Sequence, residues 1–241
     1  MRVPRLVERR RIRASDPSPP VVLVSSRAAS PRAAQRAERS PWLRRAYTLW
    51  APFYDAAVAS ALRESRRKSL GTLGDVSGQR ILLVGVGTGL DIPWLKPGAT
   101  YVGVDLTAAM IGRAKAKARE YDAPIRLVRG DGMELPLRDG SFDRAVLHLI
   151  VAVVPNPHAL LSEVARVVRP GGTIHILDKF LRPGQNAPLR RWFSPLLGRL
   201  ATNTDVVFEE VLASCPGLEL VRDEPDLGRG WFRRIVLKRP R

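Results

Sequence analysis

Short apolar runs alternate with longer amphipathic segments through the middle of the chain. Four runs rich in Val, Ile and Leu predict buried strands: 81–84, 101–105, 125–128 and 173–177. A longer apolar run over 145–154 contains a further strand, which ends near Leu147 and His148. Helices are predicted over 107–121 and 157–168. Strands that alternate with helices favour a parallel sheet with crossover helices.

The pattern changes on both sides of this alternation. An aromatic-rich segment broken by Pro52 precedes it and predicts two short helices, at about 41–50 and 55–70. After residue 182 an insert over 183–204 separates the alternation from a predicted helix near 205–215. Two final strands are expected at about 218–223 and 231–237. No internal repeat is visible.

The first strand breaks into a glycine-rich turn. Glycines at 85, 87 and 89 allow a tight turn and the close approach of a ligand. The second strand ends in Asp105, whose carboxylate can accept hydrogen bonds from the hydroxyls of a ribose. The dinucleotide fingerprint needs a glycine at position 90, where this chain has Leu90. A nucleoside ligand other than a dinucleotide is therefore predicted, and a nicotinamide-dependent oxidoreductase is disfavoured.

Further motifs follow in a fixed order. They are Gly130-Asp131-Gly132-Met133, Leu135-Pro136-Leu137, Ser141-Phe142-Asp143 and the segment 160–172, which ends in Arg169-Pro170-Gly171-Gly172. With the G-x-G-x-G turn, this set resembles the class I S-adenosylmethionine-dependent methyltransferases over about residues 41 to 240. The resemblance implies an α/β fold with a Rossmann-like seven-stranded sheet in the order 3-2-1-4-5-7-6. Strand 7 is then antiparallel, and helices cover both faces.

The resemblance also implies S-adenosylmethionine as cofactor and a set of residues that bind it. Those residues are Tyr47, Gly85, Gly87, Thr88, Gly89, Asp105, Leu106, Met110, Asp131, Gly132, Met133 and Leu147. Asp131 would accept from the adenine amino group while Met133 packs on the ring. Two alternatives stay open: Asp105 or Thr107 as a helix cap, and residues 130–132 as a simple turn.

Methyl transfer requires mainly alignment, because a sulfonium is already an activated donor. His148 and Tyr54 are the candidate catalytic residues, and Asp178 and Lys179 are weaker ones. His148 could serve as a base for a phenol or an acidic carbon; the alternative is a structural histidine with satisfied hydrogen bonds. The segment 47–55 resembles one that folds over the cofactor in bacterial phospholipid N-methyltransferases and quinone-biosynthesis C-methyltransferases. The alternative for Tyr47 and Tyr54 is packing on the core.

The insert mixes arginines with a Trp192-Phe193 pair. This composition suits a lid at an anionic membrane surface, or equally a cap on a small-molecule pocket with its arginines in water. The favoured acceptor is a phospholipid amine such as phosphatidylethanolamine; C- or O-methylation of a quinone or another small metabolite is the alternative. RNA methylation is disfavoured because Pro155-Asn156-Pro157-His158 lacks the second proline and the aromatic residue of the amino-methylating motif. A non-catalytic, cofactor-binding scaffold is the remaining alternative.

The 241 residues carry a net charge of +17, and residues 1 to 45 hold twelve Arg against three acidic residues. We expect residues 1–40 to be a disordered basic extension and residues 41–241 to form one methyltransferase domain, with cover helices over 41–72 and the lid over 183–204. Two explanations of the basic segment are equally good: an anionic partner, or an arginine-rich genome or a start codon assigned too far upstream. A transit peptide is a minority alternative.

A lone Cys215 excludes an intramolecular disulfide and a cysteine-cluster metal site, and no metal is expected. The charged segment 2–13 is atypical of a secretion signal, and the run 145–154 is too short to cross a bilayer. The expected location is the cytoplasm, with peripheral contact at the inner face of the membrane.

Overall fold

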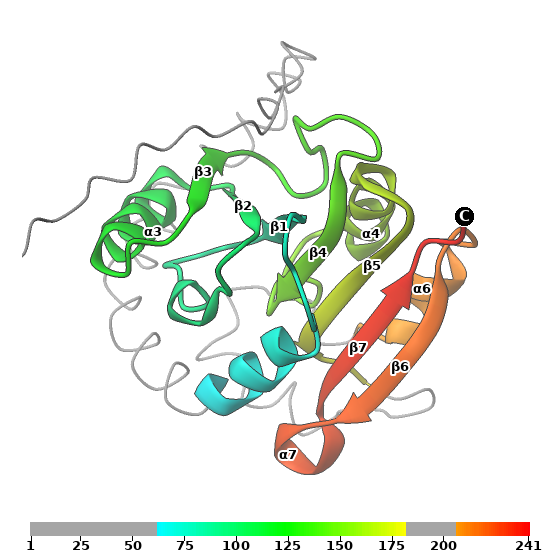
Figure 1. Ribbon diagram of the computed structural model, residues 1–241. Coiled ribbons are helices and arrows are strands. Elements are labelled where there is room, and N and C mark those ends of the chain that lie inside the picture. The colour runs from blue at the N-terminus through cyan, green and yellow to red at the C-terminus, as the bar shows by residue number, and fades with distance from the viewer. Residues whose placement is uncertain (1–61, 182–205) are drawn as a thin grey trace, which may run out of the picture.

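The computed structural model describes residues 62–181 and 206–241. Within these ranges seven strands form one sheet in the order β3-β2-β1-β4-β5-β7-β6 (Figure 1). The strands are β1 (Arg80–Val84), β2 (Thr100–Asp105), β3 (Ile125–Arg129), β4 (Phe142–His148), β5 (Val168–Lys179), β6 (Glu219–Pro225) and β7 (Phe232–Lys238). The first five pair in parallel, and β7 is antiparallel to both β5 and β6. The predicted strand order and the antiparallel seventh strand are confirmed.

Helices α3 and α4 lie within one residue of their predicted bounds, whereas the predicted helix 41–50 lies outside the described residues. The structure has η1 (Ile92–Trp94), α3 (Ala108–Glu120), α4 (Pro157–Val167), α6 (Phe208–Ala213), α7 (Leu227–Gly230) and an unlabelled helix over 62–71. Side-chain oxygens begin two of them: Thr107 accepts from the backbone of Met110, and Asn156 accepts from that of Ala159. The short helix α7, in the β6–β7 connection, was not predicted.

Two predicted elements differ in length from those observed. β5 begins at Val168 and not at Thr173, because Val168 already pairs with Phe142 before a register shift. Helix α6 covers only six residues of the predicted 205–215. The segment that follows it contains Pro216, whose ring cannot continue a helix.

Alternation along each strand divides the core into two layers. Leu82 and Val84 of β1 face the layer of α4 and α6, whereas Ile81 and Leu83 face that of α3 and the helix over 62–71. All four are at most 2% exposed. Because β1 is buried on both faces, it lies at the centre of the sheet, and the turn after it lies where the strand order reverses.

The two edges of the sheet are covered differently. Figure 1 shows α3 beside β3 at one edge and the β6–β7 hairpin at the other. On β6, Leu220 and Val221 are 49% and 58% exposed, respectively. The buried centre therefore lies around β1, β4 and β5, and the carboxyl ends of β1 and β4 meet at the position expected for a ligand.

Candidate cofactor and active site

The glycine-rich turn opens the site at the end of β1. Gly85, Gly87 and Gly89 have φ angles of +68°, +55° and +82°, which side chains with a Cβ rarely adopt. A Cβ on the first would lie 2.4 Å from Cδ1 of Ile150, and one on the third 2.6 Å from Cδ1 of Ile92. A Cβ on Gly87 would meet nothing closer than a backbone oxygen at 3.9 Å. The outer glycines are needed for packing, while the middle one borders open space where a ligand can approach.

Asp105 ties this turn to the start of α3. Its Oδ2 accepts from the backbone N–H of Gly87 at 3.0 Å, and its Oδ1 accepts from the backbone and hydroxyl of Thr107 at 3.0 and 3.2 Å. Thr107, and not Asp105, caps α3. The next side chain, Leu106, is 47% exposed. A half-buried carboxylate beside an exposed apolar side chain suits a ribose and the face of a base.

The segment after β3 lies against the same edge. The backbone N–H of Gly130 donates to the carbonyl of Asp105 at 3.0 Å, and Oδ1 of Asp131 accepts from the backbone of Met133 at 2.8 Å. Gly132 packs so tightly that a Cβ would lie 2.9 and 3.1 Å from side chains of α4 and β1. Asp131 therefore shapes the turn and keeps a second carboxylate oxygen for other partners, while Met133 packs on the core.

A buried polar cluster lies next to the glycine turn, and we call it the switch-point cluster: Arg66, Ser69, Asp91 and His148. Nδ1 of His148, at the end of β4, is 2.8 Å from Oδ1 of Asp91. Its Nε2 is 2.9 Å from the hydroxyl of Ser69. Nη1 of Arg66 donates to both oxygens of Asp91 at 2.8 Å. The cluster joins the helix over 62–71, the segment after Gly89 and the end of β4.

The electrostatics of the cluster determine the state of the Asp91 carboxylate. Burial raises the pKa of Asp91, but the neighbouring His148 and Arg66 outweigh burial and hold that pKa well below its usual range. An ionised carboxylate can only accept, so Nδ1 of His148 carries a hydrogen toward it. Both ring nitrogens are thus engaged, and the side chain is 1% exposed. This geometry corresponds to the alternative of a hydrogen-bonded structural histidine.

The ends of β4 and β5 hold the turn that follows His148. Leu149 has a φ of +61°, and its N–H donates to the carbonyl of Leu177 at 2.8 Å. Asp178, 1% exposed, accepts from the backbone of Ala152 at 3.1 Å and from that of Lys179 at 2.8 Å. Burial raises the pKa of Asp178 to about 6. This carboxylate supports the backbone at the site.

The remaining predicted site residues lie in different places. Leu147 is fully buried in the core layer of α4, on the opposite face of β4 from His148. Thr88 is buried in the glycine turn, and Met110 is half-buried in the first turn of α3. Tyr47, Tyr54 and the insert 183–204 lie outside the described residues, as does the predicted boundary at residue 40. Their roles stay predictions.

Three members of the switch-point cluster were not predicted from the sequence. Arg66 and Ser69 lie on the same face of their helix as the buried Leu62 and Leu70. Polar residues at apolar positions of an amphipathic helix were the available signal. Asp91 precedes η1 and could pass for a helix cap, yet its side chain makes no capping hydrogen bond and points into the cluster.

Comparison with known proteins identifies the family. Residues 82–176 match the family model described as a methyltransferase domain. Phosphatidylethanolamine N-methyltransferase of Cereibacter sphaeroides is 33% identical over 198 residues, covering 81% of this chain and 96% of that protein. The chain belongs to the class I S-adenosylmethionine-dependent methyltransferases. This confirms the resemblance of the sequence motifs, and S-adenosylmethionine is the cofactor of this methyltransferase.

A second sequence relative and a solved structure are also methyltransferases. Demethylmenaquinone methyltransferase of Tropheryma whipplei is 28% identical to this methyltransferase over 183 residues, covering 71% of this chain and 75% of that protein. A geranyl diphosphate C-methyltransferase of Streptomyces coelicolor, solved with Mg²⁺, geranyl diphosphate and S-adenosylhomocysteine, has a TM-score of 0.63. At 19% identity, over 75% of this chain and 81% of that one, it shows the shared fold.

The described residues fit the cofactor. Open space above Gly87, the carboxylate of Asp105 and the exposed Leu106 lie at one edge of the sheet, where a nucleoside and its amino-acid tail can be held. Within residues 62–181 and 206–241, no group of three or more His, Cys, Asp or Glu side chains is placed to hold a metal ion.

Proposed function

We propose that this methyltransferase methylates the amine of a phospholipid headgroup of the phosphatidylethanolamine type. The observation that carries the proposal is the 33% identity to a phosphatidylethanolamine N-methyltransferase over 96% of that protein's length. When bound, S-adenosylmethionine supplies an activated methyl group. Every other requirement is a matter of binding and alignment by the residues of the chain.

In this proposal the cofactor is held from three strand ends. The turn of Gly85, Gly87, Thr88 and Gly89 receives its amino-acid and ribose portions, and Asp105 accepts from the ribose hydroxyls. The adenine lies near Leu106, Met110, Asp131, Gly132 and Met133. Leu147 packs in the core beneath these residues, and Tyr47 and Tyr54 cover the methyl group.

In the described part of the chain, the state of the titratable side chains at the ends of β4 and β5 favours an amine acceptor. His148 and Asp178, at the ends of β4 and β5, are both buried, and His148 has hydrogen bonds at both ring nitrogens. Neither is free, in this arrangement, to remove a proton from an acidic carbon or a phenol. An amine that has lost its proton to solvent attacks without a protein base. The role of His148 is then to hold the Asp91 carboxylate in place and not to transfer a proton.

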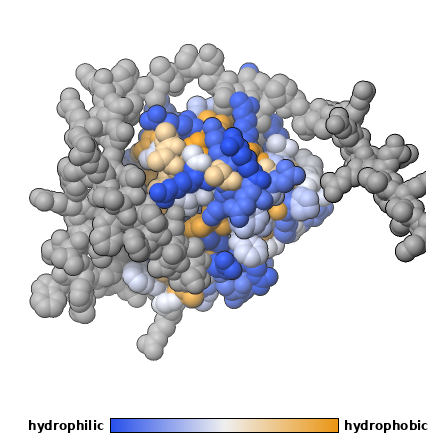
Figure 2. All heavy atoms as spheres, turned by 90° about the vertical axis from the view of Figure 1, so that its left-hand side faces the viewer, coloured by the Kyte–Doolittle hydropathy of each residue, from blue (hydrophilic) through white to orange (hydrophobic). Residues whose placement is uncertain are grey.

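A cationic surface supports an encounter with anionic lipid. The basic residues of α3 and β3 are Arg113, Lys115, Lys117, Arg119, Arg126 and Arg129. Figure 2, which views the side of the molecule that carries α3 and β3, shows much of the coloured surface as hydrophilic. Lys and Arg near a membrane surface are attracted by anionic lipids. In the described part of the chain no helix is both long and apolar enough to cross a bilayer.

The alternative acceptor is a quinone precursor. It is supported by the 28% identity to a demethylmenaquinone methyltransferase. Methylation of a ring carbon removes a proton from that carbon, so this alternative requires a base. Tyr54 is the candidate base, because it lies in the segment that resembles the one folded over the cofactor in such enzymes.

The test offers both acceptors to the full chain together with a methyl-labelled donor. Vesicles contain phosphatidylethanolamine and an anionic lipid, with or without a demethylated quinone, and label is followed into each lipid species by chromatography. We expect label in monomethylated phosphatidylethanolamine. Vesicles with phosphatidylcholine in place of phosphatidylethanolamine are the control without an acceptor amine. The Asp105→Ala variant is the control with weakened donor binding. Label in the quinone alone would overturn the proposal and support the alternative.

A further inference from the structure

The switch-point cluster lies where the sheet reverses its strand order. β1 pairs with β2 on one side and with β4 on the other, and ligands of open parallel sheets bind beyond this point. Asp91 belongs to the segment leaving β1, and His148 ends β4. Their 2.8 Å contact therefore joins the segment that follows the glycine turn to the end of β4.

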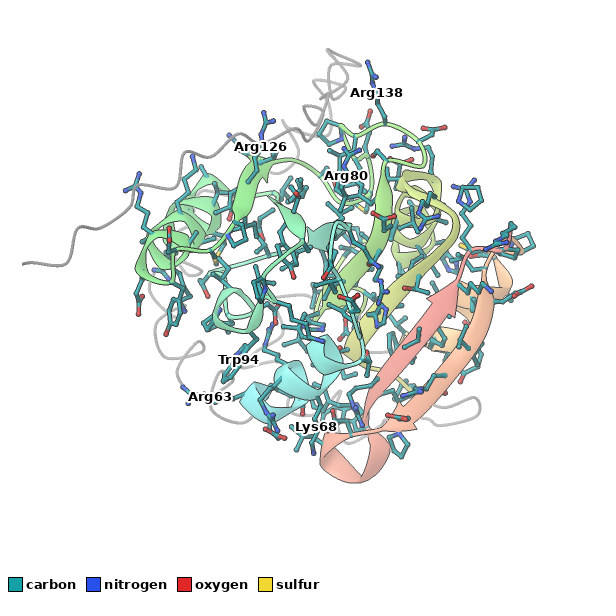
Figure 3. The ribbon with its side chains drawn as sticks, viewed as in Figure 1. Arg63, Lys68, Arg80, Trp94, Arg126 and Arg138 are labelled. Atoms are coloured by element: carbon teal, nitrogen blue, oxygen red, sulfur yellow. The ribbon has the colours of Figure 1, made fainter. Side chains whose placement is uncertain are left out.

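The cluster also fixes one helix to this point. Arg66 and Ser69 are one turn apart on the helix over 62–71, and both reach residues at the strand ends. In Figure 3, Arg63 of this helix and Trp94 of η1 lie at the same side of the molecule. The helix and the segment after the glycine turn are thus held together by an ion pair.

Stability alone is a weak reason for this ion pair. The side chains of Arg66 and Asp91 are only 9% and 6% exposed, so both charges have lost most of their hydration. Replacing a buried pair by apolar residues is often neutral or stabilising. Moreover, Nε of Arg66 is buried without a hydrogen-bond partner. The pair is therefore buried with one hydrogen-bond donor unpaired, and its effect on the charge of the site is a better reason for its presence than stability.

We propose that the Arg66–Asp91 pair sets the electrostatic potential at the donor site, and so the preference between the cationic donor and its neutral product. S-adenosylmethionine carries a sulfonium charge that S-adenosylhomocysteine lacks. Asp91 offsets the charge of Arg66 beside the end of β1, so the sulfonium is not repelled there. His148 and Ser69 are positioning residues, because they hold the Asp91 carboxylate in place from the other side.

This inference concerns donor binding only. It rests on the cofactor of the family and is independent of the phospholipid acceptor. Opposite changes of charge must therefore shift the preference in opposite directions, whereas a purely structural pair would weaken both ligands together. That sign difference is the signature to be measured.

The test is titration calorimetry with S-adenosylmethionine and with S-adenosylhomocysteine, without any acceptor. Asp91→Asn leaves the Arg66 charge uncompensated, and we expect the affinity ratio to shift about tenfold toward the product. Arg66→Met leaves the Asp91 carboxylate with His148 as its remaining partner, and the ratio should shift toward the donor, by up to about tenfold. The double variant Arg66→Met/Asp91→Asn is neutral again and should return close to the wild-type ratio.

Matched variants separate charge from folding. His175→Gln removes a bond of the same kind, between Nδ1 of His175 on β5 and the hydroxyl of Thr72 at 2.9 Å, and should lower the melting temperature without moving the ratio. Arg66→Lys keeps the charge and should keep the ratio. If Asp91→Asn fails to fold, the comparison of Arg66→Met with Arg66→Lys decides. A ratio unchanged within about twofold in every folded variant would overturn the proposal.

Discussion

Gly85 shows how one residue type serves both the turn and its packing. Its φ of +68° excludes most side chains, and the space beside its Cα is filled by Ile150. We predict that Gly85→Ala costs about 1–2 kcal/mol for the backbone conformation and about 1–3 kcal/mol more for overpacking. Donor affinity should fall as well, because Ile150 must move at the site. Urea unfolding and calorimetry measure the two effects.

Gly74 is the matched control at the residue scale. Its φ is +65°, but nothing lies within 4 Å of the position of an added Cβ. Gly74→Ala should therefore show the conformational cost alone and leave donor affinity unchanged. Equal losses of stability in the two variants would show that overpacking against Ile150 adds nothing to the free-energy cost of Gly85→Ala.

At the scale of elements, the helix over 62–71 and the turn after it contact the sheet at several polar positions, and two of these contain a buried histidine. One is the switch-point cluster, and the other is His175 of β5, whose ring nitrogens lie 2.9 Å from the hydroxyl of Thr72 and 3.0 Å from that of Thr173. Burial, and then the charge of Arg144, lowers the pKa of His175 to about 3. The folded protein thus keeps this imidazole neutral at pH values where the unfolded chain binds a proton.

The sign of the pH dependence follows from that difference. Between the unfolded pKa of about 6.5 and the folded value of about 3, the unfolded state binds more protons, so acidification destabilises the fold by at most about 1.4 kcal/mol per pH unit. Asp178, with its pKa raised to about 6, acts in the opposite direction between about 3.8 and 6. We therefore predict that the destabilisation caused by His175→Gln is largest near neutral pH and shrinks toward pH 5. Urea unfolding of both proteins across that range measures it, and a pH-independent difference would contradict it.

At the scale of the whole molecule, the net charge of +17 is concentrated toward the N-terminus. A protein of this charge should bind anionic vesicles more weakly as salt shortens the Debye length from about 10 Å toward 3 Å. We predict that deleting residues 1–40 reduces both vesicle binding and its salt dependence. Affinity for S-adenosylmethionine should stay unchanged.

Sedimentation of vesicles at several salt concentrations gives the binding, and calorimetry gives the donor affinity. Vesicles made only of phosphatidylcholine are the control without surface charge. A large loss of donor affinity in the shortened chain would show that these residues contribute to the folded domain and are not a separate extension.

The sequence by itself determined the sheet and its cofactor edge. Buried strands and amphipathic helices repeat with local periods, so β1, β2, α3 and α4 could be predicted within two residues at each end. The glycines at 85, 87 and 89 need no distant partner to indicate a turn, because their backbone freedom is a property of the residue itself. The order of the motifs then indicated the family, and the resemblance to that family implied the strand order.

Tertiary structure alone decided the chemistry around His148. Its partners Asp91 and Ser69 are 57 and 79 positions away, and the ion pair of Asp91 with Arg66 spans 25. Contacts between such distant residues leave no period in the sequence, since each side chain satisfies only its local helix or turn pattern there. Packing against the sheet is what brought the four polar groups together, and the neighbouring His148 and Arg66 are what keep the buried Asp91 carboxylate ionised.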